Sequence, residues 1–218
     1  MHVYAILHRS AALTLPEGVL SPLQSVVEGQ LAAVVEPDLA LVELQQDDAG
    51  LLQAVLAHDR VIRELFAQTT VLPLRFNTFP ALNELIADLQ TNQKTYLNQL
   101  AQLDGQAEFT LKLSPVEISE GSIAPNLKGK EYFLAKKQHY QEQQRQEELR
   151  VQEFNLIVQA IVQQYLAVAQ PDSNQICILA QKQQYDGLQR QITDLQEQMN
   201  YWELHLGDAL PPFHFVQG

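Results

Sequence analysis

The amino-acid sequence predicts an α+β protein built as two lobes that meet near Gly105. Strand-like alternation followed by helical periodicity occurs twice along the 218 residues, once on each side of the Asp104-Gly105 break. A stretch of about forty residues in the second half lacks Pro and Gly and predicts a long helix. We therefore expect two domains, at residues 1–104 and 105–218. A chain of this length buries roughly 70% of its unfolded surface, which is enough for a substantial core.

The first half has the element order of a ferredoxin-like lobe. Residues 2–8 alternate apolar side chains between two faces, as in a strand, and Glu28-Gly29 lies between two apolar runs, as in a hairpin. From Asp47 the apolar positions recur at steps of three and four, as in a helix. The expected elements are a strand at 2–8, a hairpin of 23–27 and 31–35, a helix at 47–68, a strand at 70–76 and a helix at 78–103. This order corresponds to a ferredoxin-like α+β pattern.

The second half mixes short strands with the long helix. The expected elements are a strand at 109–113, a helix at about 130–169, a central strand at 176–180, a helix at 184–200, a final strand at 202–206 and a C-terminal tail. The run 176–180 is apolar throughout, which is typical of a strand covered on both faces. Residues 135–148 of the long helix are mostly Gln, Glu, Lys and Arg, so this part cannot be buried on both sides.

Composition narrows the classes of partner. Lys and Arg total 14 against 26 Asp and Glu, which gives a net charge of −12. Only 18% of the residues are charged, and 30 Gln supply much of the remaining polar surface. An acidic chain is a poor binder of nucleic acid or anionic membrane, because phosphate contacts require Lys and Arg patches. The lone Cys177 cannot form an internal disulfide, and neither a signal peptide nor an apolar run of membrane-spanning length is present. We expect a cytoplasmic protein.

The residues predict no catalytic, cofactor or metal site. The segment Gly121 to Lys130 has the wrong spacing for a phosphate-binding loop, and no serine lies in a nucleophile turn. His205, Asp208 and His214 are close in sequence, but a Pro-Pro pair intervenes and nothing fixes them to converge. An enzyme of unrecognised type would need a titratable pair with perturbed pKa values, which the sequence does not display.

One polar group lies on an otherwise apolar helix face. His58 is on the apolar side of its helix, Asp59 is beside it, and Arg75 follows on the next strand. A buried basic group needs a partner, since an unpaired one costs several kcal/mol. We expect His58 and Asp59 to hydrogen-bond Arg75 or the adjacent backbone and so join helix to strand. A binding role for Arg75 is the alternative.

Several segments, taken in order, resemble the gas vesicle protein F/L family (GvpF/GvpL). They are Tyr4-Ala5-Ile6, His58-Asp59, Val71-Leu72-Pro73-Leu74-Arg75-Phe76, Gly129 to Leu134, Ile176 to Leu179 and the tail Gly207 to Val216. The tail differs from the family pattern before Pro211, and Asn77 stands where the family usually has Gly. The resemblance covers nearly the whole chain.

This resemblance implies a non-enzymatic accessory or minor structural protein of gas vesicles. It implies a modified ferredoxin-like N-terminal domain, an α+β C-terminal domain with a long helix, and location with the gas vesicle. The implied partners are the hydrophobic shell protein GvpA and other gas vesicle accessory proteins. The family has no catalytic residues to transfer to this chain.

A chaperone-like or nucleating role requires a surface that holds the shell protein. The candidates are the edge hairpin, with Val26 and Val34, and the tail, with Phe213 and Phe215. Strand addition or an apolar groove would provide the contact. A small-molecule-binding ferredoxin-like module, with a cleft near His58, is the alternative function.

Overall fold

The computed structural model describes residues 1–9, 13–37, 39, 48–76, 81–117 and 129–216. Two compact units divide the chain, one formed by Met1–Glu108 with Ala209–Gly218 and the other by Phe109–Asp208. The division lies close to the expected break at Gly105. The tail, which was expected in the second domain, groups with the first unit.

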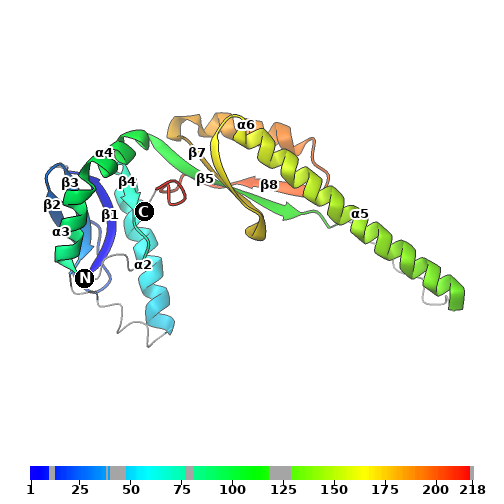
Figure 1. Ribbon diagram of the computed structural model, residues 1–218, viewed down its shortest axis with the longest axis horizontal. Helices are drawn as coiled ribbons and strands as arrows, with labels where there is room; N and C mark the ends of the chain where they lie inside the picture. Colours follow the sequence, from blue (N-terminus) through cyan, green and yellow to red (C-terminus); the bar gives the residue numbers. More distant parts are fainter. Residues whose placement is uncertain (10–12, 38, 40–47, 77–80, 118–128, 217–218) are drawn as a thin grey trace. The chain divides into compact units, whose positions relative to one another are not determined.

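A four-stranded antiparallel sheet forms the core of the first unit (Figure 1). Its strands, in the order β2-β3-β1-β4, are Gln24–Glu28, Leu31–Glu36, His2–His8 and Val71–Pro73. Strand β1 pairs with β3 on one side and β4 on the other, with an irregularity between Val3 and Ala5. Residues 2–7 of β1 and all of β3 are buried, so the two central strands are covered on both faces. The predicted strand and hairpin are confirmed.

Three described helices belong to the first unit: α2 (Asp48–Phe66), α3 (Leu82–Thr91) and α4 (Gln93–Gln102). The single helix expected at 78–103 is wrong, because the chain breaks at Asn92. Asp88 stabilises the break, since its carboxylate accepts hydrogen bonds from Asn92 Nδ2 at 2.7 Å and from the Tyr96 hydroxyl at 2.6 Å. The predicted start of that helix, at residues 78–80, lies outside the described residues.

The second unit contains another four-stranded sheet, in the order β6-β7-β5-β8. The strands are β5 (Gln106–Pro115), β6 (Leu166–Gln170), β7 (Gln175–Gln181) and β8 (Trp202–Leu206). Strand β7 is internal in this order and buried from Ile176 to Ala180, so the prediction of a central strand is confirmed.

The long helix α5 runs from Gly129 to Val162 and ends before the predicted residue 169. The expected last part of the helix is instead β6, which pairs antiparallel with β7. The 3₁₀ turn η1 (Pro171–Ser173) and Asn174, whose φ is 51°, connect the two strands. A second 3₁₀ turn, η2 (Lys182–Gln184), leads into α6 (Tyr185–Gln196).

Among the described residues, it is the C-terminal half of α5 that packs against its own unit. Ile157 and Ile161 are fully buried, and Glu153 accepts hydrogen bonds from the backbone N–H groups of Asn200 and Tyr201. The first half of α5 runs past the strands of its sheet in Figure 1. Its residues 129–134 are all exposed, and none of residues 135–148 is buried, which confirms the prediction made for that polar stretch. Within the described chain, no helix is both long and apolar enough to span a membrane.

Candidate functional site

A buried cluster of aromatic and ionisable side chains lies on one face of the first sheet. His2 and Tyr4 come from β1, Glu36 from the end of β3, and His58 from α2. The His2 ring lies 4.6 Å from the Tyr4 ring and 4.8 Å from the Phe76 ring, and the Tyr4 and His58 rings are stacked at 5.4 Å. His2, Tyr4, Glu36 and His58 are each no more than 7% exposed, so water has little access to this cluster.

The hydrogen bonds of the two histidines set their tautomers. His58 Nε2 lies 3.0 Å from the Leu74 carbonyl, which can only accept, so Nε2 carries the proton and Nδ1 accepts. His2 Nε2 lies 2.8 Å from His58 Nδ1 and therefore donates. His2 Nδ1 is left as a buried acceptor with no partner among the described residues. Burial lowers the pKa of both histidines, and together with the neighbouring His58 it brings that of His2 to about 3. Both rings are neutral at pH 7.

Glu36 is the centre of a second network. Its Oε2 accepts from the Tyr4 hydroxyl at 2.5 Å and from the Val19 N–H at 3.0 Å. Its Oε1 accepts from the Leu20 and Ser21 N–H groups at 2.5 and 2.8 Å. Burial favours the neutral acid, but the four donors outweigh it and hold the pKa of Glu36 below its usual value. The carboxylate thus fixes the loop that enters β2.

Gly18 allows this loop to approach Glu36. A Cβ atom at residue 18 would lie 2.1 Å from the Ser21 carbonyl oxygen and 2.8 Å from Glu36 Cδ. Since Cβ atoms essentially never come this close to backbone, any other residue here would displace the loop. The three N–H donors and the glycine together make a cradle for one carboxylate of the same chain, which is a structural role.

The predicted polar group divides between the interior and the surface. His58 is buried and bonds the backbone of Leu74, one residue before Arg75. Asp59 accepts from Arg63 Nε at 2.6 Å on the helix surface, and Arg75 is exposed. The link between α2 and the chain after β4 therefore runs through His58 and a carbonyl. His2, Tyr4 and Glu36 were not assigned to this group from sequence.

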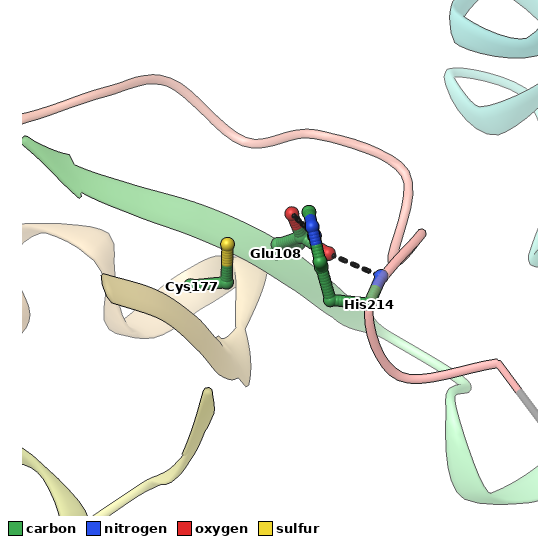
Figure 2. Close-up of side chains that lie close together, drawn as sticks. All are labelled: Glu108, Cys177 and His214. Carbon is green, nitrogen blue, oxygen red and sulfur yellow. Dashed lines mark hydrogen bonds and ion pairs between the residues drawn. The ribbon is translucent and has the colours of Figure 1, made fainter. Parts of the chain in front are cut away.

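A second buried carboxylate holds the C-terminal tail. Glu108 is 3% exposed, and its backbone exchanges hydrogen bonds of 2.9 and 2.8 Å with Leu210. Its side chain accepts from the His214 N–H at 2.9 Å and from His214 Nδ1 at 2.7 Å, as Figure 2 shows. Because a carboxylate only accepts, Nδ1 carries the proton in this contact. Glu108 thus binds the tail twice, through its backbone at Leu210 and through its side chain at His214.

Weakening this contact is expected to release the tail. Glu108→Gln leaves one acceptor oxygen for two donors, and His214→Ala removes the ring donor, each at a cost of about 1–3 kcal/mol. We expect carboxypeptidase to remove the tail of either variant about tenfold faster than that of the parent protein. His205→Ala is the matched control because His205 is exposed on β8, and it should digest at the parent rate. Equal rates in all four proteins would contradict the role of Glu108.

The predicted partner-binding residues differ in their exposure. Val34 is fully buried between β2 and β1, whereas Val26 on the edge strand β2 is half-buried. Phe213 and Phe215 are half-buried in the turn that the tail forms after Pro212. Val34 therefore offers no surface to a partner, because both of its neighbouring strands and the sheet faces cover it.

An exposed apolar edge lies in the second unit, where the sequence pattern predicted a helix. Strand β6 is the last strand of its sheet and contains no charged residue. Leu166 is 65% exposed and Val168 is 40% exposed. Soluble proteins usually protect such edges with charges, proline or a covering element.

Comparison with known proteins places this geometry in a family. A family model described as gas vesicle synthesis protein GvpL/GvpF matches residues 1–217. The chain belongs to this family. The resemblance seen in Tyr4-Ala5-Ile6, His58-Asp59 and the tail is thereby confirmed, and so is a role in gas vesicles.

Individual members of the GvpL/GvpF family support the same assignment. Gas vesicle protein F of Streptomyces sp. (strain CB03234) is 28% identical over 244 residues, with 99% of each chain covered. The crystal structure of GvpF from Microcystis aeruginosa has a TM-score of 0.66 at 14% identity, covering 99% of this chain and 98% of that one. GvpF from Anabaena sp. PCC7120 gives 0.64 at 14% identity, with 99% and 95% covered. At this identity the two structures show the fold, and they confirm the α+β class.

Proposed function

We propose that this GvpL/GvpF-family chain assists gas vesicle assembly by binding the shell protein GvpA before it polymerises. Membership of a gas vesicle synthesis family supports the pathway. A shell protein that builds a wall with one apolar face needs a partner that covers apolar surface and releases it again. A short exposed edge strand suits this task, because strand addition supplies main-chain hydrogen bonds without a deep pocket.

Strand β6 is the observation that carries the proposal. Its outer edge has no strand partner among the described residues, and Leu166 and Val168 project from the same face at alternate positions. An added strand would place its own alternate apolar side chains against these two. The edge strand β2 is a weaker candidate, since Gln24 and Ser25 are its exposed residues beside Val27.

The test is capture of purified shell protein by charged variants of the edge. Leu166→Lys combined with Val168→Lys places two charges on the proposed contact. Because binding would then have to remove water from both charges, we expect at least about tenfold weaker capture. Gln163→Lys combined with Gln164→Lys adds the same charge at exposed positions just before β6 and should capture normally. Val27→Lys places a charge on β2, an edge strand of the first sheet, and so tests the weaker candidate in the same way.

Each outcome either supports or excludes one surface as the site that binds the shell protein. Unchanged capture by a folded β6 variant would exclude β6. Loss of capture in Phe213→Ala combined with Phe215→Ala, with the β6 variant intact, would move the contact to the tail. If no variant loses capture, shell binding by these surfaces is wrong, and a thermal-shift screen showing stabilisation by a metabolite would favour the small-molecule alternative.

A further inference from the structure

Residues 133–152 of α5 carry two successive hollows on the same side. One is lined by Phe133, Lys136, Lys137 and Tyr140 together with two neighbours, and has a volume of about 360 Å³. The next is lined by Gln144, Glu147, Glu148 and Val151 with one neighbour, and has a volume of about 480 Å³. Both sets follow the spacing i, i+3, i+4, i+7. This spacing forms the four-residue hole that accepts a side chain from a facing helix in coiled-coil packing.

A single line of side chains joins the two holes. At about 100° per residue, Tyr140, Gln144 and Val151 each lie within about 20° of Phe133 around the helix axis. Phe133 is 73% exposed, Tyr140 61% and Val151 52%. Three large exposed apolar side chains on one line are unusual for a solvated helix, whose apolar residues normally face its own core.

Charges flank this line in an ordered way. Lys136 and Lys137 lie on its two sides near the start of the helix, and Glu147 and Glu148 lie on its two sides eleven residues later. Eleven residues are about three turns, so Lys136 and Glu147 share one flank and Lys137 and Glu148 share the other. The helix therefore has a basic end and an acidic end on the same face.

We propose that this face pairs antiparallel with the same face of a second copy of the chain. A two-fold axis level with Glu142 sets Phe133 against Val151 of the second copy, and Tyr140 against Gln144. On each flank the same axis brings Lys136 to within one residue, about 1.5 Å, of the level of Glu147, and Lys137 equally close to the level of Glu148. The two-fold repeats each contact, which gives four ion pairs around two apolar contacts. No other register brings both the apolar and the charged positions together.

The charge distribution favours a second copy over an unrelated partner. Residues 129–148 contain four basic and four acidic residues, whereas the whole chain has a net charge of −12. The neutral segment allows two strongly acidic chains to meet without bringing their excess charge together. A parallel pair would oppose Lys to Lys and Glu to Glu, which is destabilising. Glu147 has a long contact of 3.9 Å with Arg150 in its own chain.

The contact is short, so the dimer is expected to be weak and dependent on concentration. Exposed ion pairs contribute about 0–1 kcal/mol each and are screened by salt. Dissociation constants in the micromolar to millimolar range, rising with ionic strength, are the expected result. The contact does not involve β6 and does not depend on shell-protein binding.

Charge-swapped variants of the full chain test the proposal by sedimentation equilibrium over a series of concentrations. Lys136→Glu with Lys137→Glu, and separately Glu147→Lys with Glu148→Lys, should each weaken self-association at least about tenfold. Mixing the two variants, or combining all four substitutions in one chain, should restore it, because opposite charges again face each other. Glu131→Lys with Glu142→Lys changes the charge equally on the opposite side of the helix and should dimerise at least as well as the parent.

Disulfide trapping gives a second readout that is sensitive to weak pairs. In a Cys177→Ala background, Tyr140→Cys together with Gln144→Cys should form covalent dimers under mild oxidation, and Glu142→Cys should not. A parent protein that stays monomeric at millimolar concentration and is not trapped would overturn the proposal. So would charge-swapped variants, folded by circular dichroism, in which the four-fold substitution fails to restore pairing.

Discussion

Replacing Glu36 with Ala is expected to lower the free energy of unfolding by about 3–5 kcal/mol, because each buried donor left without its acceptor costs about 1–3 kcal/mol and the three loop donors are only partly buried. Glu36 is fully buried and accepts four hydrogen bonds. Without it, the Tyr4 hydroxyl and the N–H groups of Val19, Leu20 and Ser21 lose their acceptor. Urea unfolding at pH 7.5 measures the change.

Two further variants separate the causes of this loss. Glu36→Gln preserves the volume but replaces one acceptor oxygen with an NH₂ group that faces other donors, so it should also be destabilised, by more than about 2 kcal/mol. Tyr4→Phe removes one donor and leaves three, and should cost about 1–2 kcal/mol. If Glu36→Gln were as stable as the parent protein, the acceptor network would not be what holds the loop.

The regular strands were accessible from sequence because local pattern and final burial agree. Alternation in residues 2–8 placed His2 and Tyr4 on one face, and their rings do lie 4.6 Å apart. The apolar run in β7 indicated a covered strand, and the structure buries it on both sides. In both segments the pattern identified the strand, and the burial of both faces follows from the internal place of β1 and β7 in their sheets.

Strand β6 was missed because its composition does not distinguish helix from strand. Leu, Ala and Gln favour a helix, and neither Pro nor Gly occurs before Pro171 in this stretch. Pairing with β7 overrides this preference, with Leu166 opposite Leu179 and Gln170 opposite Gln175. The signal available in the sequence was the turn-forming Pro-Asp-Ser-Asn between two short apolar runs, which predicts a hairpin.

The buried polar cluster could be predicted only in part. A histidine on an apolar helix face indicated a buried partner, and the neighbouring backbone was among the partners named. Glu36 gave no such signal, since a Glu before Pro37 at the end of a hairpin strand is typical of a surface position. Its partners Val19, Leu20 and Ser21 contribute backbone N–H groups, which any sequence would supply. A hydrogen-bond network whose donors are backbone N–H groups is hard to predict from sequence, because those donors do not depend on which residues are present.

The protein is expected to lose stability as the pH falls below about 6.5, because His2 and His58 are neutral in the folded state. Burial lowers the pKa of both, and that of His2 is about 3. In the unfolded chain each titrates near about 6.5. Below that pH the unfolded state therefore binds more protons than the folded state and is stabilised relative to it. The stability that the two neutral histidines contribute is fully present well above pH 6.5. For His2 alone, the loss between pH 7.5 and 5.0 is about 2 kcal/mol, and His58 adds to it.

The groups that face these rings determine how the titration is interpreted. His2 faces His58 and the chain's amino terminus, which oppose a proton, and Glu36, which favours one. His58 faces the Leu74 carbonyl and has Asp59 beside it, and both favour a proton without offsetting burial. Working above pH 5 leaves the carboxylate of Glu36 ionised in both states, so the two histidines dominate the slope in this range.

His2→Gln isolates the effect, because its amide can still donate to His58 Nδ1 but cannot titrate. We expect this variant to be less stable than the parent protein at pH 7.5 and to lose about 2 kcal/mol less between pH 7.5 and 5.0, as measured by urea unfolding. His205→Gln, at an exposed position on β8, should leave the pH dependence unchanged. A His2→Gln profile parallel to that of the parent protein would mean that His2 does not stay neutral in the folded state and that the buried pair does not cause the acid sensitivity.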